Sequence, residues 1–208
     1  MAKNRLQTEK RILQAVETLL LEKGYPAVGI NSVARQAGCD KVLIYRYFGS
    51  FDGLLLAFAE TAELWWTVDE VMHETPQDTA GLPLNEYLQT LLERHASALQ
   101  GKPLTLEIMA WEMSVLNNLT IALARTRAER GMALIKKIRA HYPRPSFDVG
   151  GILGVFGAAI NYLVIRTRKS PPQHMAEEWW RLQQTIVKLL SSPALQNSAS
   201  ADSAGMIS

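Results

Sequence analysis

The chain has 208 residues, of which 48% are hydrophobic and 20% are charged, as is typical of a globular protein with an ample core. A net charge of only +2 excludes a molecule that is polybasic throughout. The charge is uneven, because residues 1–50 carry eight Lys or Arg against four Asp or Glu, a net of +4 that leaves −2 for the remainder. A basic N-terminal quarter suits contact with a polyanion.

Cysteine usage and hydropathy point to the cytoplasm. The single cysteine, Cys39, excludes an internal disulfide and fits a reducing compartment. The N-terminal residues lack the apolar core of a signal peptide. The most membrane-like run, residues 150–165, is 16 residues long, short of the roughly 20 that span a bilayer. We therefore expect a cytoplasmic protein with a buried helix at this run and no membrane partner.

Apolar residues recur at helical spacing along almost the whole chain, prolines and glycines separate the periodic segments, and no sustained alternating pattern predicts a strand. The expected fold class is therefore all-α. The final residues, 192–208, are small, polar and aperiodic, which predicts a disordered tail. The predicted helices cover residues 8–23, 30–37, 41–47, 50–73, 84–100, 104–117, 119–142, 147–168 and 174–191.

Residues 30–47 predict a helix-turn-helix, since two short helices are separated by a turn that contains Gly38. Glycine allows the turn without a Cβ penalty, and Asp40 can cap the second helix. Ile44 and Phe48 share one face of that helix and are expected to anchor it to the first one.

The remaining side chains of the second helix would then lie on exposed or partly exposed faces. In a DNA-binding helix-turn-helix this helix lies in the major groove. Cations can reach phosphates or guanine edges, tyrosine hydroxyls can donate to phosphates, and aliphatic groups can pack on thymine methyls. A helical hairpin with a solvated cationic rim explains the same residues, and the chemistry alone leaves both interpretations open. The candidate DNA contacts are Lys41, Val42, Leu43, Tyr45, Arg46 and Tyr47.

A family resemblance favours the DNA-binding interpretation. RILQAVETLLLEKGY, VARQAG and IYRYF are followed by the potential cap Ser50 and DGLL. In order and spacing this set resembles the DNA-binding domain of the tetracycline-repressor (TetR-like) family of transcriptional regulators. The resemblance implies a three-helix DNA-binding domain over residues 1–51, and a larger helical ligand-binding and dimerisation domain over 52–191. By motif position it also implies that Lys41, Tyr45, Arg46 and Tyr47 contact a double-stranded DNA operator, with Val42 and Leu43 facing the groove.

Four positions depart from the family pattern. Gly29 stands where a Thr or Ser often caps the first helix of the pair, and Val42 and Leu43 replace a glycine and a small polar residue. Phe51 replaces a frequent phosphate-binding lysine. These changes keep the fold and imply an operator that is read more by apolar contact.

Polar and aromatic residues inside otherwise apolar helices are candidates for a ligand pocket. Tryptophan beside a carboxylate would suit a flat, apolar and possibly cationic ligand. Aromatic residues at helical spacing are, however, more often ordinary core, and the two glutamates can equally face water. The candidates are Trp65, Trp66, Glu107, Trp111, Glu112, Asn161 and Tyr162.

Two late helices are candidates for self-association. Small residues recur along GGILGVFGAAINYLVI, and EEWWRLQQTIVKLLSS carries an apolar stripe. Glycine costs about 1 kcal/mol relative to alanine inside a helix, so a packing reason is expected. Two such helices from each of two copies would give the four-helix homodimer interface that the resemblance implies, and packing within one subunit is the alternative.

The alternative classes are a helical metal enzyme and a helical interaction module without DNA binding. Glu70 and His73 have the spacing of two metal ligands on one helical face, but no second such pair is present. Neither an HExxH motif, a phosphate-binding glycine loop nor a nucleophile elbow occurs. We therefore expect no enzyme, cofactor or metal. The expected protein is a homodimeric repressor that a small, largely apolar effector releases through the helix at 50–73.

Overall fold

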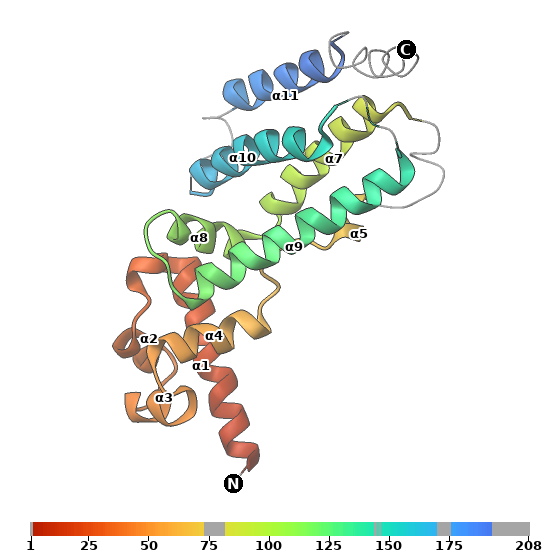
Figure 1. The fold of residues 1–208 in the computed structure, drawn as a ribbon. Coiled ribbons are helices and arrows are strands. Elements are labelled where there is room, and N and C mark those ends of the chain that lie inside the picture. Colours follow the sequence, from red (N-terminus) through yellow and green to blue (C-terminus); the bar gives the residue numbers. More distant parts are fainter. Residues whose placement is uncertain (1, 73–81, 144, 146, 170–175, 193–208) are drawn as a thin grey trace. The chain divides into compact units, whose positions relative to one another are not determined.

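The computed structural model describes residues 2–72, 82–143, 145, 147–169 and 176–192, and the side chains from residue 4 onward (Figure 1). All regular elements in these ranges are helices, which confirms the all-α class. The predictions for His73 and for the tail from residue 193 lie outside the described residues. The elements are α1 Ala2–Lys23, the 3-10 turn η1 Tyr25–Ala27, α2 Ile30–Gln36, α3 Lys41–Phe48, α4 Phe51–Thr61, α5 Val68–Met72, α7 Leu84–Gln100, α8 Pro103–Glu112, α9 Asn118–His141, α10 Val149–Thr167 and α11 Ala176–Leu190.

The chain divides into two compact units. Unit 1 comprises Met1–Trp65 and Lys102–Ala128, and unit 2 comprises Trp66–Gly101 and Glu129–Ser208. The first part of α9 belongs to unit 1 and the rest to unit 2. The predicted domain boundaries at residues 51 and 191 stay a prediction.

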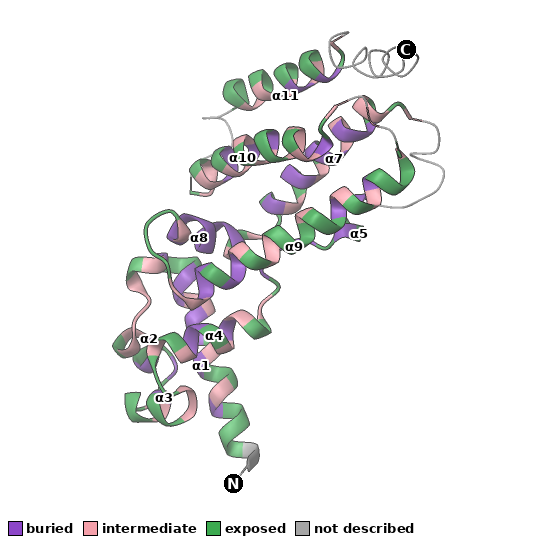
Figure 2. Cartoon of the chain, viewed as in Figure 1, coloured by how far each residue is buried: buried purple, intermediate pink, exposed green. Residues whose placement is uncertain are grey.

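The core of unit 1 is built around α1. Ile12, Val16 and Leu20 of this helix are fully buried, because their three- and four-residue spacing places them on one face. Helices α2, α4 and α8 pack against α1, and α3 packs against α2 and α4. Helix α8 is buried along almost its whole length (Figure 2). Unit 1 therefore holds the predicted helix-turn-helix together with part of the predicted larger domain.

The predicted helix at 50–73 is wrong, because the chain leaves the helix between α4 and α5. Ala62 has extended backbone angles (φ −89°, ψ 140°) and ends α4. The next helix, α5, begins at Val68 and is capped by Thr67, whose hydroxyl accepts from the Glu70 amide while the Glu70 carboxylate accepts from the Thr67 amide. This reciprocal cap is the S/T-x-x-E signature. Trp65 and Trp66 consequently lie in the break and not midway along one helix.

The start of α9 also differs from the prediction, which began this helix at residue 119. The cap is Asn117, whose Oδ1 accepts from the amides of Leu119 (2.9 Å) and Thr120 (3.1 Å). Asn118 is the first residue of the helix, and its Nδ2 donates to the carbonyl of Asp52 (3.2 Å). Because residues before this cap leave the helix, α8 ends at Glu112 and not at 117.

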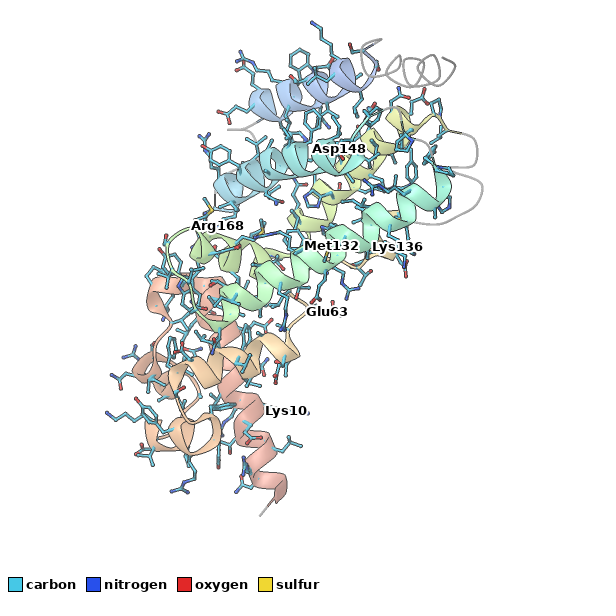
Figure 3. All side chains as sticks on the ribbon, in the orientation of Figure 1. Lys10, Glu63, Met132, Lys136, Asp148 and Arg168 are labelled. Atoms are coloured by element: carbon cyan, nitrogen blue, oxygen red, sulfur yellow. The ribbon has the colours of Figure 1, made fainter. Side chains whose placement is uncertain are left out.

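Unit 2 is centred on α7, which packs against α5, α10 and α11. Asp148 begins α10 by accepting from the amide of Gly150 (3.0 Å; Figure 3). With 19 residues, α10 is longer than the apolar run that suggested it and meets the length and hydropathy of a membrane span. Only 28% of that window is buried, so the expectation of a buried helix at this run is wrong. Among the described residues the other such candidate is the α3–α4 pair, which is bent by 68°.

Candidate nucleic-acid interface

One face of α3 is open to solvent. Lys41, Val42, Tyr45 and Arg46 are exposed, whereas Ile44 is completely buried. Leu43 and Tyr47 are half-buried, and so is Phe48, which was expected to be an anchor. Ile44 therefore bears most of the anchoring. Four of the six predicted contacts share the open face, and the other two lie at its margins.

The turn before α3 is built by two residues that the sequence identified. Gly38 has a positive φ of 61°, a conformation that favours glycine. Asp40 is extended, and its Oδ1 accepts from the amide of Val42 (2.8 Å). The carboxylate thereby satisfies one of the free amides at the first turn of α3. These two residues determine where the open face begins.

Ser32 compensates for the weak cap at Gly29, a role that the sequence analysis missed. Gly29 is the N-cap of α2 and has no side chain to offer. The Ser32 hydroxyl accepts from the Gly29 amide (3.0 Å) and donates to the carbonyl of Ala27 (2.6 Å). It thus replaces the missing Thr or Ser and joins α2 to the turn before it. The signal for it was a serine three residues after a cap position.

Gly53 fixes the joint between α3 and α4, and the sequence analysis also missed it. A Cβ at this position would overlap the carbonyl oxygen of Phe48, the last residue of α3. The Gly53 amide donates to Ser50 Oγ (3.0 Å), which confirms Ser50 as the cap of α4. Only a residue without a side chain allows this close approach, so the end of α3 rests directly on the backbone of α4.

We expect Gly53→Ala to lower the free energy of unfolding by about 1–3 kcal/mol, because the added methyl must push α3 and α4 apart. Urea unfolding followed by circular dichroism measures the change. Gly131→Ala is the matched control, since a Cβ at Gly131 of α9 has no neighbour within 4 Å. That variant should be stabilised by up to about 1 kcal/mol, and equal effects of the two changes would contradict the close approach.

Tyr47 is restrained by the N-terminal helix. The Arg5 guanidinium lies over the Tyr47 ring, 5.2 Å from its centroid, and also pairs with Glu9 (2.8 Å). The contact brings an exposed cation of α1 beside α3. Two side chains, Tyr47 and Glu9, thus fix the orientation of the Arg5 guanidinium.

In unit 1 the predicted pocket residues are mostly buried. Trp65, Glu107 and Trp111 are each at most 5% exposed. Glu112 is partly buried and binds Arg127 through two parallel hydrogen bonds of 2.6 and 2.9 Å, the strongest geometry for such a pair. The Arg127 guanidinium also lies 5.8 Å from the Trp65 ring centroid. Trp65, Glu112 and Arg127 therefore form one cluster, in which Arg127 was not predicted.

Trp111 has another environment. Its ring stacks on Tyr25 of η1, with centroids 5.5 Å apart and planes 12° apart. The stack joins α8 to the turn between α1 and α2.

In unit 2, Trp66 and Asn161 belong to a buried hydrogen-bonded chain through His95. Trp66 Nε1 donates to His95 Nδ1 (2.8 Å), and the other ring nitrogen lies 3.1 Å from Asn161 Oδ1. An acceptor role at Nδ1 places the proton on Nε2, which donates to Asn161. Burial lowers the pKa of His95 to about 4, against a smaller raising effect from Asn161. The ring is therefore neutral near pH 7.

Tyr162 lies apart from this chain, although it was expected to share a space with Asn161. It is 56% exposed, and the guanidinium of Arg166 lies 5.5 Å from its ring centroid. The predicted pocket residues thus fall into two groups, one in each unit, with Tyr162 on the exposed side of α10.

A cavity of about 10 Å³ lies in unit 2, roughly the space of one water molecule. None of the seven predicted pocket residues lines it. The cavity lining comprises Gln89, Leu92, Glu93, Ile160, Trp179, Leu182, Gln183 and Ile186.

In the described part of the chain, His, Cys, Asp and Glu form no group of three that could hold a metal.

An N-terminal helix-turn-helix with an exposed, basic second helix is the arrangement found in DNA-binding helix-turn-helix proteins. Uncharacterised HTH-type transcriptional regulators from two strains of Mycobacterium tuberculosis are each 40% identical to this chain over 48 residues. The match covers 23% of this chain and 24% of each relative, so the similarity spans about a quarter of their length.

Solved structures show the same fold over most of the chain. NalD, the secondary repressor of the MexAB-OprM multidrug efflux pump in Pseudomonas aeruginosa, is 20% identical with a TM-score of 0.56, covering 88% of this chain and 96% of its own. The TetR family regulator PfmR from Thermus thermophilus is 17% identical with a TM-score of 0.51, covering 91% and 97%.

Residues 12–58 match the model for bacterial regulatory proteins of the tetR family. The helix-turn-helix segment is thus similar to this family, and over these residues the resemblance found in the sequence is confirmed. The similar proteins named here are described as transcriptional regulators or as a repressor.

Proposed function

We propose that the protein is a cytoplasmic, sequence-specific DNA-binding transcriptional regulator that acts as a repressor. The observation that carries this proposal is the open face of α3, which presents two cations and a tyrosine on a helix fixed by Asp40, Ile44 and Gly53. Lys41 and Arg46 supply charge for phosphates or guanine edges, and Tyr45 supplies a hydroxyl. Leu43 and Tyr47 lie at the margins of the contact.

The test is binding of the purified protein to DNA fragments that flank its own gene, over a series of salt concentrations. We expect Lys41→Ala and Arg46→Ala each to weaken binding by about 1–3 kcal/mol and to reduce the salt slope by roughly 1 for each phosphate that is no longer neutralised. Lys136→Ala is the matched control, because Lys136 is an exposed cation of α9 in unit 2 (Figure 3). Equal salt slopes in all four proteins would contradict the assignment of α3.

We propose that the protein is a homodimer that reads an operator with two half-sites. Gly151, Gly154, Val155, Ala158 and Tyr162 are exposed at helical spacing along α10. Added Cβ atoms at Gly154 and Gly157 would meet nothing within 4 Å, so packing inside the subunit does not explain these glycines. A second copy of the same face would cover them, as small residues allow close helix approach.

We expect Val155→Asp to weaken self-association at least tenfold, since Val155 is 70% exposed and a charge would be buried in the proposed interface. Sedimentation velocity over a concentration series measures the change. Met132→Asp is the control, as Met132 is another exposed apolar side chain, on α9 (Figure 3). A dimer that tolerates Val155→Asp and dissociates with Met132→Asp would place the interface elsewhere.

A small, largely apolar effector completes the proposal. Its candidate contacts form two separate sets, Trp65, Glu107, Trp111 and Glu112 within unit 1 and Trp66 and Asn161 within unit 2, and either set could line a site inside its own unit. Tyr162, which is exposed on α10, lies apart from both sets. The break between α4 and α5 removes the continuous helix that was expected to couple effector to DNA. Within unit 1, the hydrogen bond from Asn118 to the Asp52 carbonyl offers another link, because it joins α9 to the start of α4. An effector that binds and leaves operator affinity unchanged would contradict the mechanism.

A further inference from the structure

The two aliphatic residues at the start of α3 have different surroundings. Val42 is 53% exposed, whereas Leu43 is half-buried. Tyr45, one turn after Val42, is 50% exposed. Residues three apart are neighbours on a helix surface, so Val42 and Tyr45 form a short apolar ridge on the open face. Val42 is therefore the aliphatic side chain that a partner of α3 meets first.

The start of α3 is poorly suited to hold a phosphate. The Asp40 carboxylate already occupies the Val42 amide, which would otherwise be a donor for an anion at the helix N-terminus. The carboxylate also repels a phosphate that approaches this turn. Lys41 and Arg46 flank the ridge and can reach the backbone on either side of it. This arrangement favours a base edge, and not the DNA backbone, opposite Val42.

Thymine adds a C5-methyl group to the edge that it presents in the major groove. We propose that Val42 contacts the methyl group of one thymine in each operator half-site and so determines specificity at that base pair. The inference rests on the proposed function, since it requires that α3 enters the major groove. The sequence suggested only that Val42 and Leu43 favour an operator read by apolar contact. The inference names Val42 as the side chain that makes this contact.

The experiment begins with selection of binding sites from a pool of random duplexes by the full-length protein. Thymines of the selected site are then replaced one at a time by deoxyuridine, which removes only the methyl group. Affinities are measured with the parent, Val42→Ala and Tyr45→Phe proteins at one salt concentration. Circular dichroism confirms that each variant keeps the parent's helix content.

At one thymine in each half-site, loss of the methyl should weaken parent binding about fourfold, and about fifteenfold when both half-sites are changed. The loss should become clearly smaller in Val42→Ala, because the two Cγ methyl groups that reach furthest from α3 are then gone, and should persist unchanged in Tyr45→Phe. Effects of deoxyuridine that are equal in the parent and in Val42→Ala would overturn the inference and leave the regulator intact. A protein that selects no sequence at all would overturn the proposed function and the inference with it.

Discussion

Replacing Trp111 by alanine is expected to lower the free energy of unfolding by about 3–5 kcal/mol. The side chain is 5% exposed, so its removal creates a large cavity in unit 1. The change also removes the stack on Tyr25, an aromatic pair worth about 0.5–1.5 kcal/mol beyond its buried area. Urea unfolding followed by far-UV circular dichroism measures the loss.

The control for this variant lies two residues along the chain. Met113 is 75% exposed, and Met113→Ala should change stability by less than about 0.5 kcal/mol. A stable Trp111→Ala protein would show that the ring is not needed for the core of unit 1. Because Trp111 was also predicted to line a ligand pocket, that result would favour the pocket over the core interpretation.

Acidification is expected to destabilise the protein through His95. The unfolded imidazole has a pKa near 6.5 and the folded one a pKa of about 4, because burial disfavours the charged form. Between these values the unfolded state binds more protons than the folded state, so stability rises with pH. Above pH 6.5 the ring is neutral in both states and does not lower the free energy of unfolding. The loss of unfolding free energy grows as pH falls from 6.5 to 4, and it reaches about 3 kcal/mol below pH 4.

His95→Gln isolates this contribution. An amide can accept from Trp66 and donate to Asn161 as the neutral imidazole does, but it does not titrate. The difference in unfolding free energy between parent and variant should therefore change by about 3 kcal/mol between pH 7 and pH 4. Denaturant unfolding at several pH values measures this difference. A constant difference over that range would contradict a buried neutral histidine.

The helix-turn-helix was largely predictable because its signals are local. The caps Asp40 and Ser50, the turn at Gly38 and the burial of Ile44 each follow from a residue and its immediate neighbours. The break after α4 was equally local, since Thr67 and Glu70 carry the cap signature. It was missed because the apolar pattern on both sides suggested one continuous helix.

Contacts between distant segments were not predictable from one sequence. Arg127 joins Glu112 across 15 positions, and His95 joins Asn161 across 66. Neither pairing can be read from the sequence pattern. The periodicity of apolar residues predicts which face of a helix is buried, but it does not predict which residue of another helix lies against that face. The same holds for Gly53, because its need for space comes from the path of the backbone at Phe48.

Asp40 has a consequence for how a DNA-reading helix would distinguish sites. Its negative charge at the start of α3 opposes every stretch of DNA backbone equally, whatever the sequence. A favourable contact to a base edge forms only at the matching site. The carboxylate therefore lowers affinity for random DNA and operator alike, and leaves recognition dependent on side chains such as Val42. In a genome with about 10⁶–10⁹ competing sites, the preference for the operator then comes from contacts to base edges, and attraction between the start of α3 and the DNA backbone adds nothing to it.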